Sequence, residues 1–133
     1  MSRLYLDACI VIYYVERHPV YANGIDILLK NALSAEICYS PLTRLECLVK
    51  PLRSRDMPLQ QLYQQFFAPQ RFLSITPAIF DRAARLRADN LGLKTPDALH
   101  LATALHYGCA EFWTNDERLN KIAPHLSRNV CAP

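Results

Sequence analysis

The sequence is poor in glycine and has no long hydrophobic run, and each absence excludes a class of protein. Only three of its 133 residues are glycine and no segment is of low complexity, so long disordered tails are not expected. The longest apolar stretch lies between Asp7 and Glu16 and is too short to span a bilayer. The first residues, MSRLYLD, lack the layout of a signal peptide, so we expect no secretion signal.

The sequence also lacks paired cysteines. Its five cysteines stand singly inside apolar segments, with no C-x-x-C pair, and five is an odd number. This pattern argues against a disulfide framework and against a cysteine-based zinc site, and it predicts buried free thiols. Because free thiols persist in a reducing compartment, we expect a cytoplasmic protein. The cysteines are Cys9, Cys38, Cys47, Cys109 and Cys131.

The apolar content of the chain is sufficient for one folded domain. A chain of 133 residues with 51% hydrophobic residues can bury a substantial core, and no linker divides it, so we expect a single domain over residues 1–133. The formal net charge of +3 is mild. Such a charge permits a nucleic-acid partner but does not require one.

Short apolar segments alternate with segments of helical periodicity along the chain. This alternation is typical of an α/β fold whose central sheet is mainly parallel and has four to five strands. Ser40-Pro41 and Thr76-Pro77 have the composition of helix starts, since a hydroxyl caps a helix and proline fits its first turn. The predicted strands are residues 3–6, 36–39, 72–75, 111–114 and, at an edge, 129–131; the predicted helices are residues 8–15, 20–32, 42–52, 58–67, 77–91, 95–107 and 117–122.

The segment Lys94–Leu105, KTPDALHLATAL, has the clearest helix start in the chain. We predict Thr95 as the N-cap and Pro96 as the first helical residue, with Asp97 in the first turn at the positive end of the helix dipole. Behind Asp97, apolar residues recur at helical spacing and predict a buried stripe. Asp97 is therefore predicted at the mouth of a buried helix, either as a capping acid or as part of a site.

Three further acids have similar positions relative to the predicted sheet. Asp7 directly follows the first strand, Asp116 follows the strand at 111–114, and Glu46 lies in an apolar run of the helix after the second strand. In parallel sheets, functional groups gather outside the carboxyl ends of the strands. We therefore predict that Asp7, Glu46, Asp97 and Asp116 converge on one site.

Converging carboxylates repel one another, which raises their pKa values and destabilises the fold unless a cation is bound. Few basic residues are neighbours of these acids in the sequence, with Lys94 and Arg118 as the candidates. Oxygen ligands suit hard cations such as Mg²⁺ or Mn²⁺, and these ions promote phosphodiester hydrolysis. The alternative is that the acids are helix caps and ion-pair partners without a common site.

Four segments resemble, in order, the four acidic motifs of the PIN domain family. They are LYLD at 4–7, TRLE at 43–46, PDALHLATA at 96–104 and TNDERL at 114–119. No single motif is specific, but the ordered set covers nearly the whole chain. Within the family, the short length and the single-domain form resemble VapC-type ribonuclease toxins of prokaryotic toxin–antitoxin pairs.

The resemblance implies a three-layer α/β/α fold and RNA cleavage that depends on Mg²⁺ or Mn²⁺. It implies that Asp7 and Asp97 are the primary metal ligands and that Glu46 completes the cluster, directly or through water. Asp116 would hold a water molecule of the first or of a second metal ion, and Thr114 would hydrogen-bond within the site.

The resemblance also implies partners: an RNA substrate, a second copy of the chain in a homodimer, and a cognate antitoxin protein. The antitoxin would lie in a hydrophobic groove and block the acidic site. Several aromatic residues are either part of the core or part of such a surface, and the sequence leaves both possibilities open. They are Tyr13, Tyr14, Tyr63, Phe66 and Phe67.

Two alternative functions remain: a non-catalytic binding module with the same fold, and a metal-dependent phosphatase acting on small phosphoesters. Cys9, which stands where the family commonly has Asn, favours the binding module weakly, whereas the intact acids oppose it. A deep closed pocket would favour the phosphatase, and an open acidic groove with basic rims would favour RNA. His100, three residues after Asp97, is predicted to pack or to hydrogen-bond rather than to bind metal, because hard metals prefer oxygen.

Overall fold

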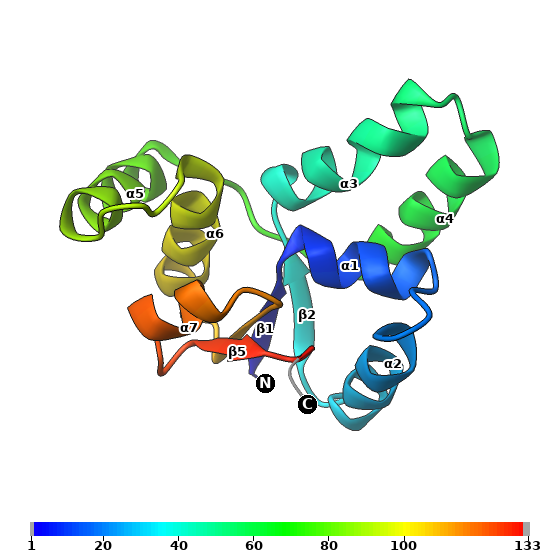
Figure 1. Cartoon of the computed structure of the whole chain (residues 1–133), viewed down its shortest axis with the longest axis horizontal. Coiled ribbons are helices and arrows are strands. Elements are labelled where there is room, and N and C mark those ends of the chain that lie inside the picture. The colour runs from blue at the N-terminus through cyan, green and yellow to red at the C-terminus, as the bar shows by residue number, and fades with distance from the viewer. Residues whose placement is uncertain (1, 132–133) are drawn as a thin grey trace.

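The computed structural model describes residues 2–131, in which helices and strands alternate as expected (Figure 1). The elements are β1 (Arg3–Leu6), α1 (Ala8–Val15), α2 (Ala22–Asn31), β2 (Glu36–Tyr39), α3 (Pro41–Arg53), α4 (Met57–Phe67), β3 (Arg71–Phe72), α5 (Pro77–Asp89), α6 (Thr95–His106), β4 (Glu111–Thr114), α7 (Glu117–Ile122) and β5 (Ser127–Asn129).

The strands form one five-stranded parallel sheet in the order β3-β2-β1-β4-β5. The central strand β1 pairs with β2 on one side and with β4 on the other. In the register with β4, Leu6 lies opposite Trp113, so the residues that follow both strands emerge at the same edge of the sheet. The prediction of a mainly parallel sheet is confirmed.

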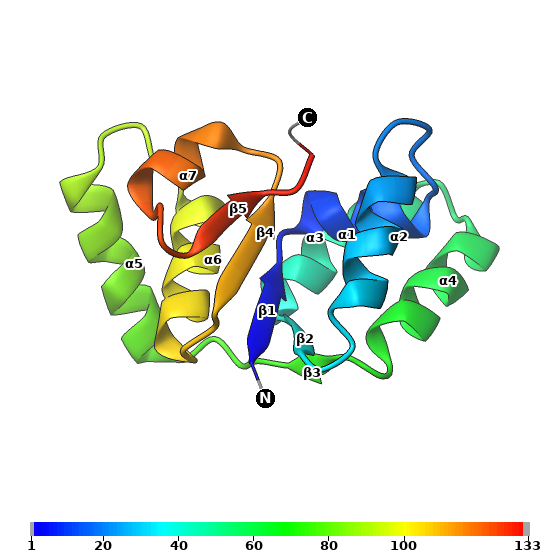
Figure 2. The same cartoon turned by 90° about the horizontal axis from the view of Figure 1, so that it is seen from below.

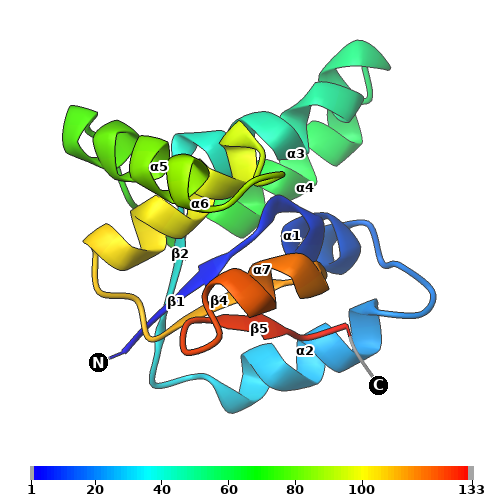
Figure 3. The ribbon, with the colours of Figure 1, turned by 60° about the vertical axis from the view of Figure 1, so that its left-hand side comes forward.

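Helices cover both faces of the sheet, which gives the expected three-layer α/β/α arrangement (Figures 2 and 3). Because side chains alternate along a strand, β1 contributes to both faces. Leu4 and Leu6 pack with residues of α1, α2 and α4, whereas Tyr5 packs with residues of α5, α6 and α7. Trp113 belongs to the same core cluster as Leu4 and Leu6 and is 2% exposed, as expected for a core residue.

The predicted N-cap of α6 is wrong by one residue. Lys94 is the N-cap and makes no side-chain capping bond, and Thr95 is already helical. The Thr95 hydroxyl instead accepts a hydrogen bond from Nη1 of Arg87 at 2.7 Å. This partner comes from α5, so nothing in the local sequence indicated it. Asp97 remains in the first turn of the helix.

Both edge strands differ from their predicted ranges. The strand expected at 72–75 is Arg71–Phe72, and after a backbone bond from Leu73 to Tyr39 the chain leaves the sheet toward α5. The strand expected at 129–131 is Ser127–Asn129. Each edge strand pairs on one side only, so its position depends on its neighbour more than on its own pattern.

All five cysteines carry free thiols. Cys38, Cys47 and Cys109 are buried, as the sequence predicted, whereas Cys9 and Cys131 are only partly buried. Within residues 2–131, no helix has the length and apolar character needed to cross a bilayer.

Candidate metal centre

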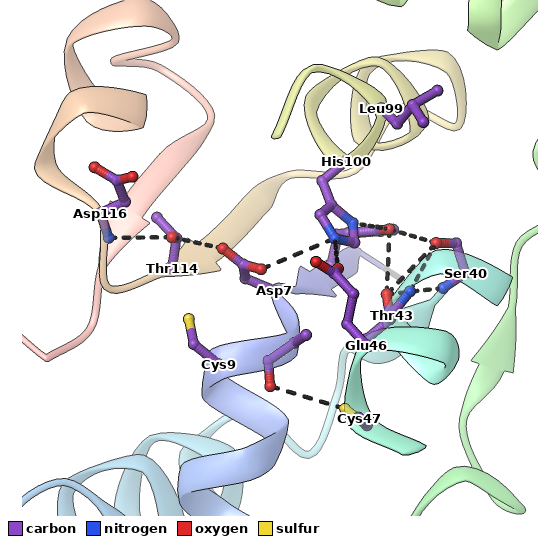
Figure 4. A network of polar contacts seen from close by, with 12 residues as sticks. Asp7, Cys9, Ser40, Thr43, Glu46, Cys47, Leu99, His100, Thr114 and Asp116 are labelled. Carbon is purple, nitrogen blue, oxygen red and sulfur yellow. Dashed lines mark hydrogen bonds and ion pairs between the residues drawn. The ribbon is translucent and has the colours of Figure 1, made fainter. Parts of the chain in front are cut away.

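Asp7 lies where β1 ends and α1 begins. Its side chain does not cap α1, although its backbone occupies the N-cap position. Oδ2 instead accepts a hydrogen bond from the Thr114 hydroxyl at 2.9 Å, and the Asp7 backbone N–H donates to the carbonyl of Trp113 at 2.9 Å. The side chain is 14% exposed. Two bonds to the end of β4 thus fix Asp7 and leave Oδ1 directed at the space beside α6 (Figure 4).

Glu46 reaches the same space from α3. This helix begins at Ser40, whose hydroxyl accepts from the backbone N–H of Thr43 in a reciprocal capping box, and Pro41 occupies the first turn. Glu46 follows Thr43 by three residues, about one helical turn. Its Oε1 lies 2.6 Å from Nε2 of His100 (Figure 4).

His100 stands between these two acids. It lies on α6 and is 1% exposed, and its Nε2 lies 2.6 Å from Oε1 of Glu46 and 3.9 Å from Oδ1 of Asp7. One ligand atom from each of the three residues falls within 4.8 Å of the others. The structure therefore shows the hydrogen-bonding role expected for His100. Its central position was missed, although its place three residues after Asp97 was a signal for it.

Asp97 lies half-buried in the first turn of α6, one turn before His100. Burial raises the pKa of Asp97, and the negative charges of Asp7 and Asp116 raise it further, whereas the positive charge of Arg118 opposes this rise. The charges of Asp7 and Asp116 therefore act on Asp97, although Asp97 is not part of the compact group of Asp7, Glu46 and His100.

Asp116 is the N-cap of α7 and is held by Arg118. Its Oδ1 accepts from the backbone N–H of Arg118 at 2.9 Å, and its Oδ2 lies 2.7 Å from Nη2 of the same residue. The Arg118 guanidinium lowers the pKa of Asp116 despite the opposing effect of burial. The Asp116 backbone N–H donates to the Thr114 hydroxyl at 3.1 Å, so Thr114 links Asp116 to Asp7 (Figure 4).

The four predicted acids are thus arranged unequally. Asp7 and Glu46 lie within one compact group with His100. Asp97 is coupled to Asp7 and Asp116 through their charges. Asp116 is joined to Asp7 through Thr114 but is neutralised by its own arginine. The carboxylate oxygens match the ligand preference of Mg²⁺ or Mn²⁺, so the donor set fits such an ion.

Cys9 does not supply a nucleophile to this site. Its thiol donates to Oδ1 of Asn115 at 3.3 Å, and burial, reinforced by the charge of Asp7, raises its pKa. The thiol is therefore protonated at neutral pH and weakly nucleophilic. Cysteine at this position leaves the bond between Thr114 and Asp7 in place.

Comparison with known proteins gives one family. The PIN domain profile matches residues 4–124, which is most of the chain. A search of curated proteins finds no significant match.

Several solved structures have the same fold at low sequence identity. A DNA-bound VapBC from Salmonella typhimurium matches with a TM-score of 0.82 at 18% identity, covering 98% of this chain and 100% of the other. A toxin–antitoxin complex from Klebsiella pneumoniae matches with a TM-score of 0.78 at 22% identity, covering 97% of this chain and 98% of the other. VapC20 of Mycobacterium tuberculosis matches with a TM-score of 0.73 at 12% identity, covering 90% of this chain and 95% of the other. That protein is described as a toxin that cleaves the sarcin–ricin loop.

Proposed function

The chain belongs to the PIN domain family, and on this premise we propose that it is a metal-dependent endoribonuclease, the toxin of a type II toxin–antitoxin pair. The observation that carries the proposal is the group of Asp7, Glu46 and His100 at the carboxyl end of the central strand. The negative charge of Asp7 also raises the pKa of Asp97. We further propose that residues 1–133 form a single PIN domain.

In the proposed reaction, Asp7 and Asp97 hold a Mg²⁺ or Mn²⁺ ion, with Glu46 and Asp116 completing the site. A bound divalent ion supplies positive charge for the phosphate and lowers the pKa of water. Thr114 orients Asp7 through its bond to Oδ2. Because contacts within the fold fix Asp7, Glu46 and Asp116, little reorganisation of these three groups is needed when RNA binds.

The surroundings of Asp97 favour RNA over a small phosphoester. A hollow of about 290 Å³ beside Asp97 has a mainly apolar lining, to which Arg118 and Lys121 add two basic side chains. Arg118 is 68% exposed but pairs with Asp116, so the exposed Lys121 supplies most of the available positive charge at the rim. Basic groups at the edge of an acidic site attract the phosphates of a polynucleotide backbone. This arrangement supports the nuclease rather than the phosphatase alternative.

A groove between α1, α2 and α4 is our candidate for the antitoxin site. Its volume is about 540 Å³, and its lining includes Tyr14, Leu62 and Phe66. Of the five aromatic residues left open by the sequence, Tyr63 and Phe67 are buried in the core, whereas Tyr14 and Phe66 reach this groove. The similar structures from Salmonella and Klebsiella are toxin–antitoxin complexes, which supports a protein partner here.

The outer face of α3 is our candidate for a homodimer contact. Leu45, Val49 and Leu52 recur at helical spacing and are 59%, 42% and 56% exposed. A row of exposed apolar side chains on one helix is typical of a protein–protein contact.

Cleavage of RNA by the purified chain tests the enzyme proposal. We expect cleavage with Mn²⁺, none with EDTA, and none for Asp7→Asn, which removes a charge but keeps the side-chain shape. Asp26→Asn is a matched control, because Asp26 pairs with Lys30 on α2, and it should retain full activity. Cleavage that survived EDTA, or an active Asp7→Asn variant, would refute the metal site. A folded chain that cleaved none of several RNAs would favour the binding module.

A further inference from the structure

Tyr5 and His100 form a buried connection to the acidic site, and neither belongs to the set of proposed acids. Tyr5 lies on β1 and His100 on α6, with 0% and 1% of their surfaces exposed. The Tyr5 hydroxyl lies 2.6 Å from Nδ1 of His100, and Nε2 of His100 lies 2.6 Å from Oε1 of Glu46. Both ring nitrogens therefore have a hydrogen-bond partner, and the bond to Glu46 can be followed in Figure 4.

The hydrogen-bonding capacity of these groups determines which atom donates and which accepts in each of the two bonds. An ionised Glu46 carboxylate can only accept, so Nε2 of His100 carries a proton and donates it. In the neutral ring, Nδ1 is then an acceptor. The Tyr5 hydroxyl, which keeps its proton at neutral pH, donates to Nδ1. These bonds therefore favour the Nε2–H tautomer of a neutral ring.

Ser40 and Thr43 supply the other end of the connection. The Ser40 backbone N–H donates to Oγ1 of Thr43 at 3.2 Å, and the Thr43 backbone N–H donates to Oγ of Ser40 at 3.5 Å. Both hydroxyl oxygens thus accept from the backbone, and their own protons remain for the Tyr5 oxygen, at 2.7 and 3.3 Å. The start of α3 is tied through Tyr5 and His100 to Glu46, about one turn further along the same helix.

We propose that Tyr5 and His100 are positioning residues, which hold the Glu46 carboxylate beside Asp7 for the divalent cation. This inference rests on the proposed function, because it assigns Glu46 to cation binding. A ring that donates through Nε2 presents no lone pair to the cation, so His100 acts through Glu46 and not as a ligand. Residues that orient metal ligands in this way commonly change metal affinity by about 10- to 100-fold.

The affinity of the metal-free chain for Mn²⁺, measured by titration calorimetry, tests the proposal. Tyr5→Phe removes only the hydroxyl, and we expect binding about tenfold weaker. His100→Leu removes both bonds and should weaken binding at least as much. His100→Gln keeps an N–H for Glu46 and an oxygen for Tyr5, so most of the affinity should return.

Tyr63→Phe is the matched control. It removes the hydroxyl of a second buried tyrosine, which donates to the carboxylate of Glu16 at 2.5 Å. Glu16 follows α1 at the end of the helix opposite Asp7. Any general effect of losing such a hydroxyl should appear in the melting temperatures of both Tyr→Phe variants. The Mn²⁺ affinity should fall for Tyr5→Phe alone.

The tautomer of His100 gives a readout that needs neither metal nor activity. Nitrogen NMR of the metal-free wild type should show the Nε2–H form, and Tyr5→Phe should give a mixture of both tautomers. A predominant Nδ1–H form in the wild type would contradict the proposed donation from Tyr5 to Nδ1 and from Nε2 to Glu46.

Two patterns of affinity would overturn the positioning role and leave the proposed function intact. Wild-type Mn²⁺ affinity in Tyr5→Phe and in both His100 variants would show that the connection is structural only. Complete loss in both His100 variants, with Tyr5→Phe unaffected, would make His100 a ligand. If His100→Leu failed to fold, Tyr5→Phe and His100→Gln would still decide the question. Absence of Mn²⁺ binding by the wild type would instead overturn the proposed function, and the inference with it.

Discussion

The acids of the site differ in how far neighbouring groups stabilise their negative charges. Arg118 pairs with Asp116 and lowers its pKa, and Thr114 donates to Asp7. Asp97 differs from both, since burial and its acidic neighbours raise its pKa. Ionisation of Asp97 therefore destabilises the metal-free fold, and replacing this acid should affect stability and activity in opposite directions.

Asp97→Asn should stabilise the metal-free chain at pH 7 while abolishing RNA cleavage. Folding favours protonated Asp97, so the stability from this group is complete below the unfolded pKa of about 3.9 and is lost as the pH rises through the raised folded pKa. In EDTA, the melting temperature of the variant should exceed that of the wild type by a few degrees at pH 7 and by less at pH 4. A variant less stable than the wild type at pH 7 would contradict the assigned repulsion.

The ends of the helices follow local chemistry where a cap or a glycine specifies them. Ser40 forms the reciprocal capping box of α3, and Asp56 accepts from the backbone N–H of Leu59 at the start of α4. Gly108 follows α6 with φ +64°, in the left-handed region that other residues enter only with strain. Gly24 lies inside α2 with no atom within 4 Å of the position that a Cβ would take.

The two glycines should therefore respond in opposite directions to the same substitution. Gly108→Ala should lower the free energy of unfolding by about 1 kcal/mol, because alanine must adopt the positive φ. Gly24→Ala should raise it by about 0.5–1 kcal/mol, because alanine has the higher helix propensity. Urea denaturation of both variants measures the difference. A stabilising Gly108→Ala would show that the end of α6 rearranges.

The order of the strands brings together residues that are far apart in the chain. Thr114 and Asp7 are separated by 107 positions and are joined at 2.9 Å, because β1 and β4 are neighbours. The same arrangement brings the acids together, and their mutual repulsion destabilises the metal-free fold. A cation that binds only the folded chain should therefore stabilise the whole molecule.

Mn²⁺ should raise the melting temperature of the wild type and not that of Asp7→Asn. At a concentration 100 times the dissociation constant, the stabilisation is about 2.7 kcal/mol, or about 8 °C for a domain of this size. Differential scanning fluorimetry with Mn²⁺ and EDTA measures the shift. An equal shift in the wild type and in Asp7→Asn would place the bound ion elsewhere.

A charged substitution on the outer face of α3 should convert a dimer to a monomer. Leu45→Glu introduces a charge into the exposed apolar row, and light scattering should show the halved mass. Phe80→Glu alters a side chain on α5 that is 54% exposed, and it should leave the mass unchanged. A wild type that is already monomeric would remove the homodimer from the proposal.

The sequence by itself determined the inner strands and the positions of the acids relative to them. β1, β2 and β4 have the predicted bounds, because each is a short apolar run between polar breaks. Asp7 follows β1 directly and Asp116 follows β4 after Asn115, which local pattern alone could indicate. The predicted hydroxyl cap at Ser40 is also present, since its partners lie within three residues.

Only the tertiary structure decided the features that depend on distant neighbours. The edge strands β3 and β5 were misplaced, and Thr95 is bound by Arg87 of another helix instead of capping its own. The strand order β2-β1-β4, which no local pattern encodes, brings Asp7 beside Thr114. It also buries His100 between Tyr5 and Glu46, because a hydrogen-bonded side chain acquires its partners only when separate elements pack together.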